Sequence, residues 1–182
     1  MKTIFIDGGA RIGESLDLYV RHQPKLLGCE IHLFECNPSH QHTLHNLTNQ
    51  YPNYNIFIHE MALWNTTGEQ NFYFSIDQWG DLGCTLDKTK RERLDLNSPV
   101  VVKTTQLSEF LKNFDKTDYI IIKLDIEGAE WEVVSDLIDS EQILMVDELY
   151  VEWHDVFFDK DFSSLRNKLN EYKHMIYNEW NY

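Results

Sequence analysis

Apolar residues along the chain fall into short runs, separated by longer stretches in which apolar and polar positions alternate with a helical period. Short apolar runs bounded by turn residues predict strands. The run at 119–125 is almost entirely aliphatic, which is typical of a strand buried on both faces of a sheet. Six strands are predicted in this way, at residues 3–7, 30–35, 55–60, 119–125, 144–153 and 174–180.

Four helices are predicted between or after these strands. They cover residues 12–20 (Ile12, Leu16, Tyr19 and Val20 on one face), 39–50, 128–139 (Trp131, Val134, Leu137 and Ile138 inward) and a segment with Phe162, Leu165, Leu169 and Tyr172. Strands that alternate with helices pair in parallel through right-handed crossovers. The predicted fold class is therefore α/β, a doubly wound and mostly parallel sheet, with residues 1–182 forming a single domain.

Residues 61–118 interrupt this alternation, because a crossover helix needs far fewer residues. They predict an inserted hairpin between strands three and four, followed by a helix around 107–111. Long excursions of this kind are often functional. The aromatic group Phe72, Tyr73, Phe74 and Trp79 is either the core of this hairpin or a platform on which a substrate stacks, and both interpretations remain open.

Charge and composition narrow the class of partner. The 182 residues include 16 Lys and Arg against 30 Asp and Glu, a net charge of −14, with 13% aromatic residues. The aromatic content argues against a disordered acidic tail, and the charge argues against binding to nucleic acid or to an anionic membrane.

Targeting signals are missing from the pattern. No apolar run approaches the roughly 20 residues of a membrane span, and Asp7 interrupts the first run where a secretory signal would continue. Three cysteines without a Cys-x-x-Cys pair fit a reducing compartment. A cytoplasmic location is therefore expected.

The ends of the first two strands carry the most informative residues. The first strand ends in Asp7-Gly8-Gly9-Ala10-Arg11-Ile12-Gly13, and the second ends in Phe34-Glu35. A glycine turn admits a ligand close to the backbone, and an acid after the second strand can accept hydrogen bonds from ribose hydroxyls. The pair indicates a nucleoside bound across both strands.

The kind of nucleoside follows from the same residues. Ala10 replaces the second glycine of the dinucleotide motif, Asp7 would repel a diphosphate, and no P-loop is present. S-adenosylmethionine carries no phosphate, and its sulfonium and ammonium groups suit an acidic strand end. It is the predicted cofactor.

The chain resembles the FkbM type of S-adenosylmethionine-dependent methyltransferases. The resemblance rests on blocks in the family's order, which are 6–14, 33–38 (Leu-Phe-Glu-Cys-Asn-Pro), 61–63, 102–107 and 122–130 (Ile-Lys-Leu-Asp-Ile-Glu-Gly-Ala-Glu). Two positions depart from the pattern: Arg11 stands where Asn is usual, and Cys36 where Pro is usual. The resemblance implies a class I methyltransferase, Rossmann-like fold.

It also implies roles for individual residues. The loop of Asp7, Gly8, Gly9, Ala10 and Gly13 would hold the methionine part of the cofactor, and Glu35 the ribose. Asn37, Met61 and Ala62 would line the adenine side. Asp125, at the end of the fourth strand, would lie close to the transferable methyl group.

Candidate catalytic residues follow strands four and five. Besides Asp125, these are His154, which could take a proton from an acceptor hydroxyl, and Glu152, which could orient it or bind the acceptor. The interpretation of His154 and Glu152 as rim residues stays open. Lys123 shares the parity of Asp125 and could pair with it, either as a structural buried pair or as a catalytic one.

Other charged groups have simpler explanations. Glu127 and Glu130 fall at the start of a helix, where acids stabilise the helix dipole whatever the function. Asp125, Glu152 and His154 could together hold a divalent metal, but neither their order nor the family supports this. The histidines His40, His42 and His45 are interpreted as a solvated helix face. No metal site is predicted.

The predicted function is S-adenosylmethionine-dependent methyl transfer, most simply O-methylation of a hydroxyl on a sugar, a glycan or another small molecule. Two alternatives come from other classes. One is a non-catalytic scaffold that keeps the cofactor pocket, and the other is a nicotinamide-dependent sugar-modifying enzyme, against which Ala10 and Asp7 speak.

Overall fold

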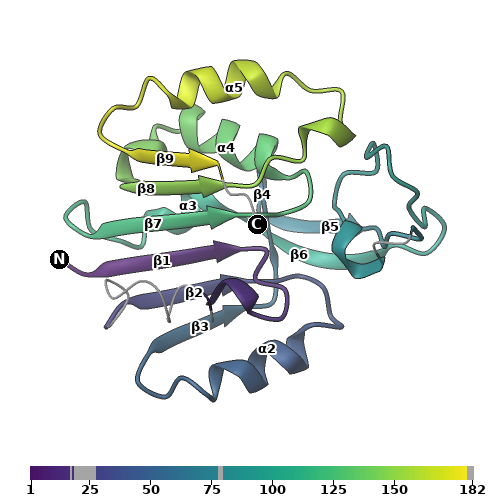
Figure 1. Ribbon diagram of the computed structural model, residues 1–182, viewed down its shortest axis with the longest axis horizontal. Coiled ribbons are helices and arrows are strands. Elements are labelled where there is room, and N and C mark those ends of the chain that lie inside the picture. The colour runs from purple at the N-terminus through teal and green to yellow at the C-terminus, as the bar shows by residue number, and fades with distance from the viewer. Residues whose placement is uncertain (17, 19–27, 78–79, 180–182) are drawn as a thin grey trace.

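Six parallel strands in the order β3-β2-β1-β7-β8-β9 form the main sheet (Figure 1). The computed structural model describes residues 1–16, 18, 28–77 and 80–179. The strands are β1 (Thr3–Gly8), β2 (Glu30–Phe34), β3 (Asn55–His59), β7 (Tyr119–Leu124), β8 (Glu148–Val151) and β9 (Ile176–Glu179). Counted along the chain they follow the order 3-2-1-4-5-6, so the direction of winding reverses between β1 and β7.

Helices cover both faces of this sheet, as a doubly wound fold requires. One face packs through Ile4, Ile6, Ile120, Ile122 and other aliphatic residues against the helices α3 (Leu107–Leu111), α4 (Glu130–Asp139) and α5 (Phe162–Leu169). The other face packs through Phe5, Ile31 and Leu33 against Leu44 of α2 (Gln41–Thr48). Strict alternation along each strand produces these two cores. The predicted α/β fold class is confirmed.

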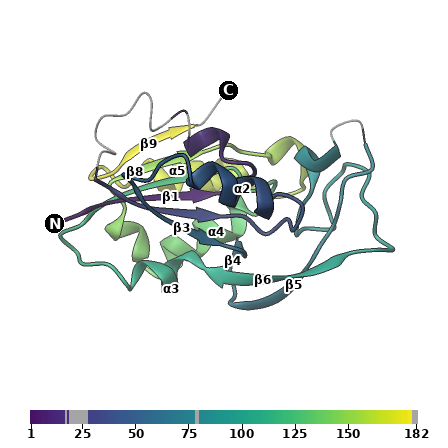
Figure 2. The same ribbon diagram turned by 90° about the horizontal axis from the view of Figure 1, so that it is seen from below.

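The excursion after β3 is a second, three-stranded sheet in place of the single hairpin that we predicted. Its strands are β4 (Ala62–Trp64), β5 (Gly68–Phe72) and β6 (Val100–Gln106), in the order β4-β6-β5. β5 pairs antiparallel with β6, which is the expected hairpin, and β4 adds in parallel on the other side. Figures 1 and 2 show this sheet beside the carboxyl ends of the main strands, on the side of α3.

Several predicted boundaries change. Residues 144–147 were predicted as the start of a strand, but Gln142–Met145 form a 3-10 turn (η3) and β8 begins only at Glu148. The helix expected from residue 128 begins at Glu130, since Glu127 and Gly128 adopt positive φ angles of 54° and 104°. In α4, Val133 is fully buried, while Trp131 and Ile138 only pack against the core.

The remaining elements agree more closely. α5 contains Phe162, Leu165 and Leu169 on its buried side and ends before Tyr172. β9 matches the expected last strand, although Trp180 lies outside the described residues. Of the helix expected at 12–20, residues 14–16 and 18 are helical, and residues 17, 19 and 20 lie outside the described residues. No described helix is long and apolar enough to cross a membrane.

A histidine pair links β3, at one edge of the main sheet, to its neighbour β2. His32 Nδ1 lies 2.9 Å from His59 Nε2, and the His59 ring stacks on Phe34 at 4.3 Å. Burial, together with repulsion from His32, lowers the pKa of His59 to about 4, from an ordinary value of 6.5. The pair is therefore neutral in the folded protein at physiological pH.

This pair predicts a loss of stability in mild acid. Between pH 6.5 and about 4 the unfolded chain binds the His59 proton and the folded chain does not, so the free energy of unfolding falls as the pH falls. We expect His59→Phe, which keeps an aromatic ring, to reduce the loss between pH 7 and pH 5 by on the order of 1 kcal/mol. Urea unfolding at both pH values measures this difference. The same substitution at the exposed His42, His42→Phe, serves as the control. If His59→Phe loses as much unfolding free energy between pH 7 and pH 5 as the unmodified protein does, the assignment is refuted.

Candidate active site

A cavity of about 620 Å³ opens at the carboxyl ends of β1, β2, β7 and β8. This is the edge where winding reverses and where open α/β sheets bind their ligands. Its lining includes the apolar side chains of Phe34, Met61, Ala62, Leu63 and Phe72 together with polar groups. The polar groups include Glu35, Asn37, His40, Asp125, Glu127 and Glu152.

A buried lysine joins the two central strands beneath the cavity. Lys123 and Asp7 are both fully buried, and their Nζ and Oδ1 atoms are 3.1 Å apart. The same Nζ lies 3.4 Å from Asp125 Oδ2 and donates to the Gly9 carbonyl at 3.2 Å. Burial raises the pKa of Asp7, and Lys123 opposes that rise. Lys123 therefore pairs with Asp125 and also holds the glycine loop to β7.

The glycine loop turns directly over the end of β2. The amides of Gly9 and Ala10 both donate to the Phe34 carbonyl at 3.0 Å. Gly9 has φ of 78°, and a Cβ there would lie 1.8 Å from the Asp125 carbonyl oxygen. Only glycine allows the two strand ends to approach this closely.

Glu35 organises the loops on both sides of it. Its two carboxylate oxygens accept hydrogen bonds from the backbone amides of Arg11, at 2.8 Å, and Asn37, at 2.6 Å. His40 Nδ1 lies 3.8 Å from Glu35 Oε1. The carboxylates of Glu35 and Asp81 together raise the pKa of His40. The positive charge of Arg11, the departure from the family pattern, is taken up by Asp81 and Glu14.

Asn37 presents a donor to the cavity. Its side chain is 2% exposed, and Oδ1 accepts from the amide and hydroxyl of Ser39. Its Nδ2 is buried and has no hydrogen-bond partner among the described residues. A buried unpaired donor that lines a cavity is available to a ligand acceptor.

The excursion supplies the opposite wall. Asp81, Leu82, Cys84, Thr85 and Leu86 all line the cavity. Thr85 donates to the Glu127 carbonyl at 2.7 Å, so this wall is tied to the loop after β7. Of the aromatic group, Phe72 lines the cavity and belongs to a small apolar cluster with Cys84 and Val102, whereas Trp79 lies outside the described residues.

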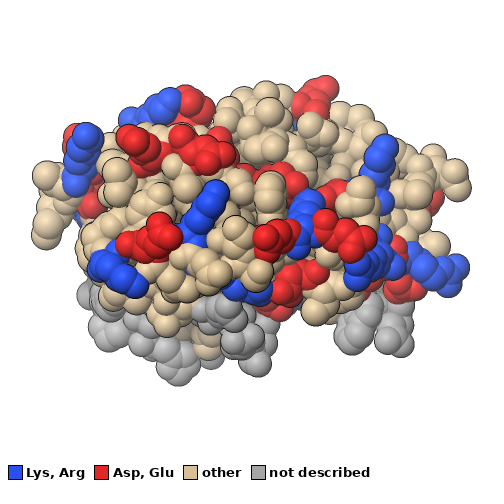
Figure 3. All heavy atoms as spheres, turned by 90° about the horizontal axis from the view of Figure 1, so that it is seen from above, with Lys and Arg blue, Asp and Glu red and all other residues tan. Residues whose placement is uncertain are grey.

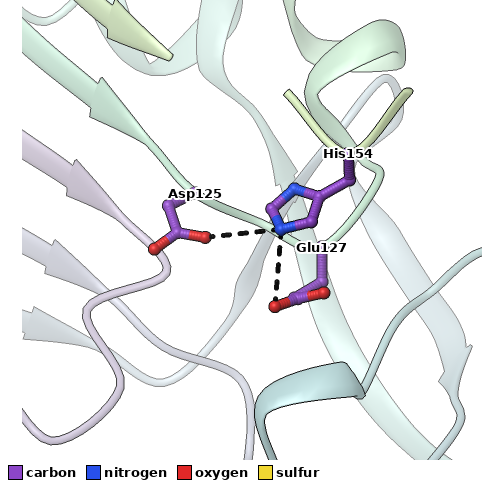
Figure 4. A group of neighbouring side chains, drawn as sticks. All are labelled: Asp125, Glu127 and His154. Atoms are coloured by element: carbon purple, nitrogen blue, oxygen red, sulfur yellow. Dashed lines mark ion pairs between the residues drawn. The ribbon is translucent and has the colours of Figure 1, made fainter. Parts of the chain in front are cut away.

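His154 lies behind the carboxylates at the end of β8. Its Nε2 faces Asp125 Oδ1 at 3.9 Å and Glu127 Oε1 at 3.5 Å (Figure 4). Its Nδ1 lies 3.0 Å from Oε1 of Glu130, which is fully buried. Although burial opposes it, the carboxylates Glu130 and Glu127 raise the pKa of His154 to about 11. These carboxylates therefore favour the protonated form of the ring in the free protein.

Glu130 has a larger role than a residue that only stabilises a helix dipole. Its oxygens accept from the amides of Ile126, at 2.8 Å, and Gly128, at 2.9 Å. It therefore shapes the left-handed turn of Glu127 and orients His154. Glu152 completes this group: burial and the charge of Asp125 raise its pKa, and its Oε2 is buried without a hydrogen-bond partner in the described part of the chain.

The predicted site residues separate into two layers. Gly9, Glu35, Asn37, Met61, Ala62, Asp125 and Glu152 line the cavity. Asp7, Gly8, Ala10 and Gly13 are buried and lie outside its lining, where they support the loop. His154 likewise lies outside the lining and contacts the cavity through Asp125 and Glu127. The sequence alone does not identify Asp81, Thr85 or Lys90 as site residues. Nothing in their spacing along the chain links them to the strand ends that they contact in the fold.

The interpretation of all three histidines after residue 39 as a solvated face is wrong for His40. It is 7% exposed, precedes α2 and lies 2.9 Å from Asp81 through Nε2. His42 and His45 are exposed, as expected. His40 differs because it directly precedes the helix, beside the Glu35 carboxylate.

Comparison with known sequences agrees with this geometry. The sequence profile of the methyltransferase FkbM domain matches residues 7–176. The chain belongs to the FkbM methyltransferase family. Comparison with curated protein sequences gives no match.

One solved structure shares the fold, the crystal structure of methyltransferase FkbM from Methylobacillus flagellatus KT. It is 18% identical, with a TM-score of 0.59, over 93% of this chain. The match spans 37% of the length of that protein. Membership of this family argues against the nicotinamide-dependent alternative.

The buried lysine predicts a large stability effect in this FkbM domain. Lys123→Met leaves Asp7 buried without its partner, and we expect a loss of about 3–5 kcal/mol in the free energy of unfolding. Adding Asp7→Asn removes the uncompensated charge and should recover part of this loss. The exposed pair of Lys112 and Glu109 is the control, because Lys112→Met should cost less than about 1 kcal/mol. Equal losses at the two lysines would contradict the assignment.

The glycine loop allows a second comparison. Gly9→Ala and Gly28→Ala both place a Cβ on a residue with positive φ, which costs about 1–2 kcal/mol. At Gly28 no described atom lies within 4 Å of the added Cβ, whereas at Gly9 it meets the Asp125 carbonyl. We therefore expect Gly9→Ala to cost at least about 2 kcal/mol more, measured by urea unfolding. Similar losses would show that the two strand ends are not in contact.

Proposed function

We propose that this FkbM domain binds S-adenosylmethionine in the cavity and transfers its methyl group to a hydroxyl of a sugar, glycan or small molecule. The observation that carries the proposal is the pairing of Glu35 and Asn37 at the end of β2. There a carboxylate and an unpaired buried amide donor face a cavity with apolar walls. This is the donor and acceptor set that a ribose and an adenine base require.

The residues of the site fit the cofactor. Glu35 would accept from the ribose hydroxyls through lone pairs that its two backbone contacts leave available. Asn37 Nδ2 would donate to the nucleoside, and Phe34, Met61 and Ala62 would cover the base. Asp125 and Gly9 would border the amino acid end. When bound, the cofactor supplies a methyl group on a positively charged sulfur.

Carboxylates surround the region where an acceptor would bind. Asp125, Glu127 and Glu152 line the same end of the cavity. On the outer surface seen in Figure 3, by contrast, acidic and basic side chains are interspersed. Negative potential at this end would favour a cationic methyl donor. Carboxylate oxygens accept hydrogen bonds from sugar hydroxyls, and either Asp125 or Glu152 would take the acceptor proton. Placement of the reactants in line would supply much of the rate.

Binding calorimetry with S-adenosylhomocysteine tests the cofactor site. We expect Glu35→Gln to weaken binding by roughly 10- to 100-fold, since a hydrogen bond to a charged group contributes about 1.5–3 kcal/mol. Glu14→Gln is the matched control, because it removes an exposed carboxylate from the rim of the same cavity and should change affinity less than about threefold. Absence of binding to the unmodified protein, or equal effects of the two substitutions, would refute the proposal.

Transfer of a radiolabelled methyl group to a panel of sugars, nucleotide sugars and matched amino sugars tests the acceptor class. Label on hydroxyl oxygen is expected. Label on nitrogen would refute O-methylation, and cofactor binding with no transfer to any acceptor would favour the scaffold alternative.

A further inference from the structure

We propose that Asp125, Glu127 and His154 form a binding site for a divalent first-row transition-metal ion at the floor of the cavity. One ligand atom from each residue lies within 4.8 Å of the others. The set combines an imidazole nitrogen with two carboxylate oxygens, a donor set suited to Mn²⁺, Fe²⁺ or Zn²⁺. From the sequence, Asp125 and His154 are considered together with Glu152 as metal ligands and no site is predicted, whereas the folded chain brings Glu127 rather than Glu152 to the other two.

The distances between these atoms suit a shared ion better than direct contacts. A charge-assisted N–H···O⁻ bond is typically about 2.7–2.9 Å long. His154 Nε2 is instead 3.5 Å from Glu127 Oε1 and 3.9 Å from Asp125 Oδ1. Ligands placed about 2.0–2.2 Å from a tetrahedral ion lie roughly 3.3–3.6 Å apart. The two distances from His154 are within a few tenths of an ångström of this range, and all three ligand atoms lie within 4.8 Å of one another.

Each carboxylate is already oriented for this role. Lys90 Nζ holds Glu127 Oε2 at 2.7 Å, and Lys123 Nζ lies 3.4 Å from Asp125 Oδ2. In both residues the other oxygen faces His154 Nε2, as Figure 4 shows. Glu127 keeps this position in a left-handed conformation with φ of 54°, which is unfavourable for a residue with a side chain. Backbone strain of this kind is retained where the surroundings impose it.

The histidine has the outer-shell partner that metal ligands usually have. Glu130 Oε1 lies 3.0 Å from Nδ1 and is fully buried, which directs Nε2 toward the two carboxylates. A carboxylate on the second ring nitrogen orients a ligating histidine and increases its basicity. Metal binding would displace the proton from Nε2, as it does at any histidine ligand.

Charge at the site favours a cation as well. The carboxylates of Asp125, Glu127, Glu130 and Glu152 surround His154, and the buried Glu152 Oε2 has no hydrogen-bond partner within residues 1–16, 18, 28–77 and 80–179. The two nearby lysines are each shared with a further carboxylate, Lys90 with Glu92 and Lys123 with Asp7. A divalent ion would offset this excess of negative charge.

Three protein ligands leave coordination positions open to the cavity. A hydroxyl bound there would have a lowered pKa, as metal-bound water does, and would be held at the end of the cavity that Asp125 lines. This catalytic role rests on the proposed function, whereas binding of the ion does not.

The test is titration of the full chain, stripped of metal with a chelator and without cofactor, with MnCl₂. Calorimetry measures binding, and electron paramagnetic resonance counts free Mn²⁺. We expect one saturable site per chain, weakened at least tenfold by Asp125→Asn and by Glu127→Gln. Glu132→Gln is the matched control. Glu132 is a partly buried carboxylate of the following helix α4 that pairs with Lys160, so its substitution should change affinity less than twofold.

A measurement on the unmodified protein removes dependence on the folding of the variants. In chain labelled with ¹⁵N-histidine, substoichiometric Mn²⁺ should broaden the His154 resonances before those of the exposed His42 and His174. Absence of saturable binding, or binding unaffected by Asp125→Asn and Glu127→Gln, would overturn the proposal and leave His154 as an ion-pair partner only. Calorimetry with S-adenosylhomocysteine, performed without metal, reports separately on the proposed function.

Discussion

The ammonium group of Lys123 is the constraint on which the rest of the site depends. It is fully buried at the point where the winding of the sheet reverses, and it contacts one carboxylate from each central strand and the glycine loop between them. A buried charge is tolerated only when it is paired and hydrogen-bonded. The ends of β1 and β7 must therefore stay in one arrangement, which fixes where Asp125 and the loop after it can lie.

A second layer of carboxylates extends this arrangement outward. Glu35 ties the glycine loop to the turn after β2, and Glu130 ties the turn after β7 to the residue that follows β8. Both acids bond backbone amides of loops that have no regular structure of their own. The loops around the cavity thus obtain part of their shape from buried carboxylates that accept hydrogen bonds from their backbone amides.

The sequence predicted the parts of the fold that depend on local pattern. The aliphatic run at 119–125 and the acid after each strand were sufficient to place β7, Glu35 and Asp125 correctly. The pattern failed where distant contacts decide the conformation. Met145 and Val146 are apolar because they pack into the core beside α3 and α4, not because they begin a strand. Glu130 resembled an ordinary helix-start acid, since only the folded chain brings His154 to it.

The excursion that forms the far wall of the cavity is tied to Glu127 by Thr85 and Lys90. This attachment divides the excursion into two parts with different freedom to evolve. Exposed residues such as Leu82 can be exchanged without loss of these contacts, whereas Thr85 and Lys90 must be kept together with Glu127. A chimaera that takes this segment from a relative would therefore keep the cavity wall joined to the loop after β7 only if those two contacts are transferred with it.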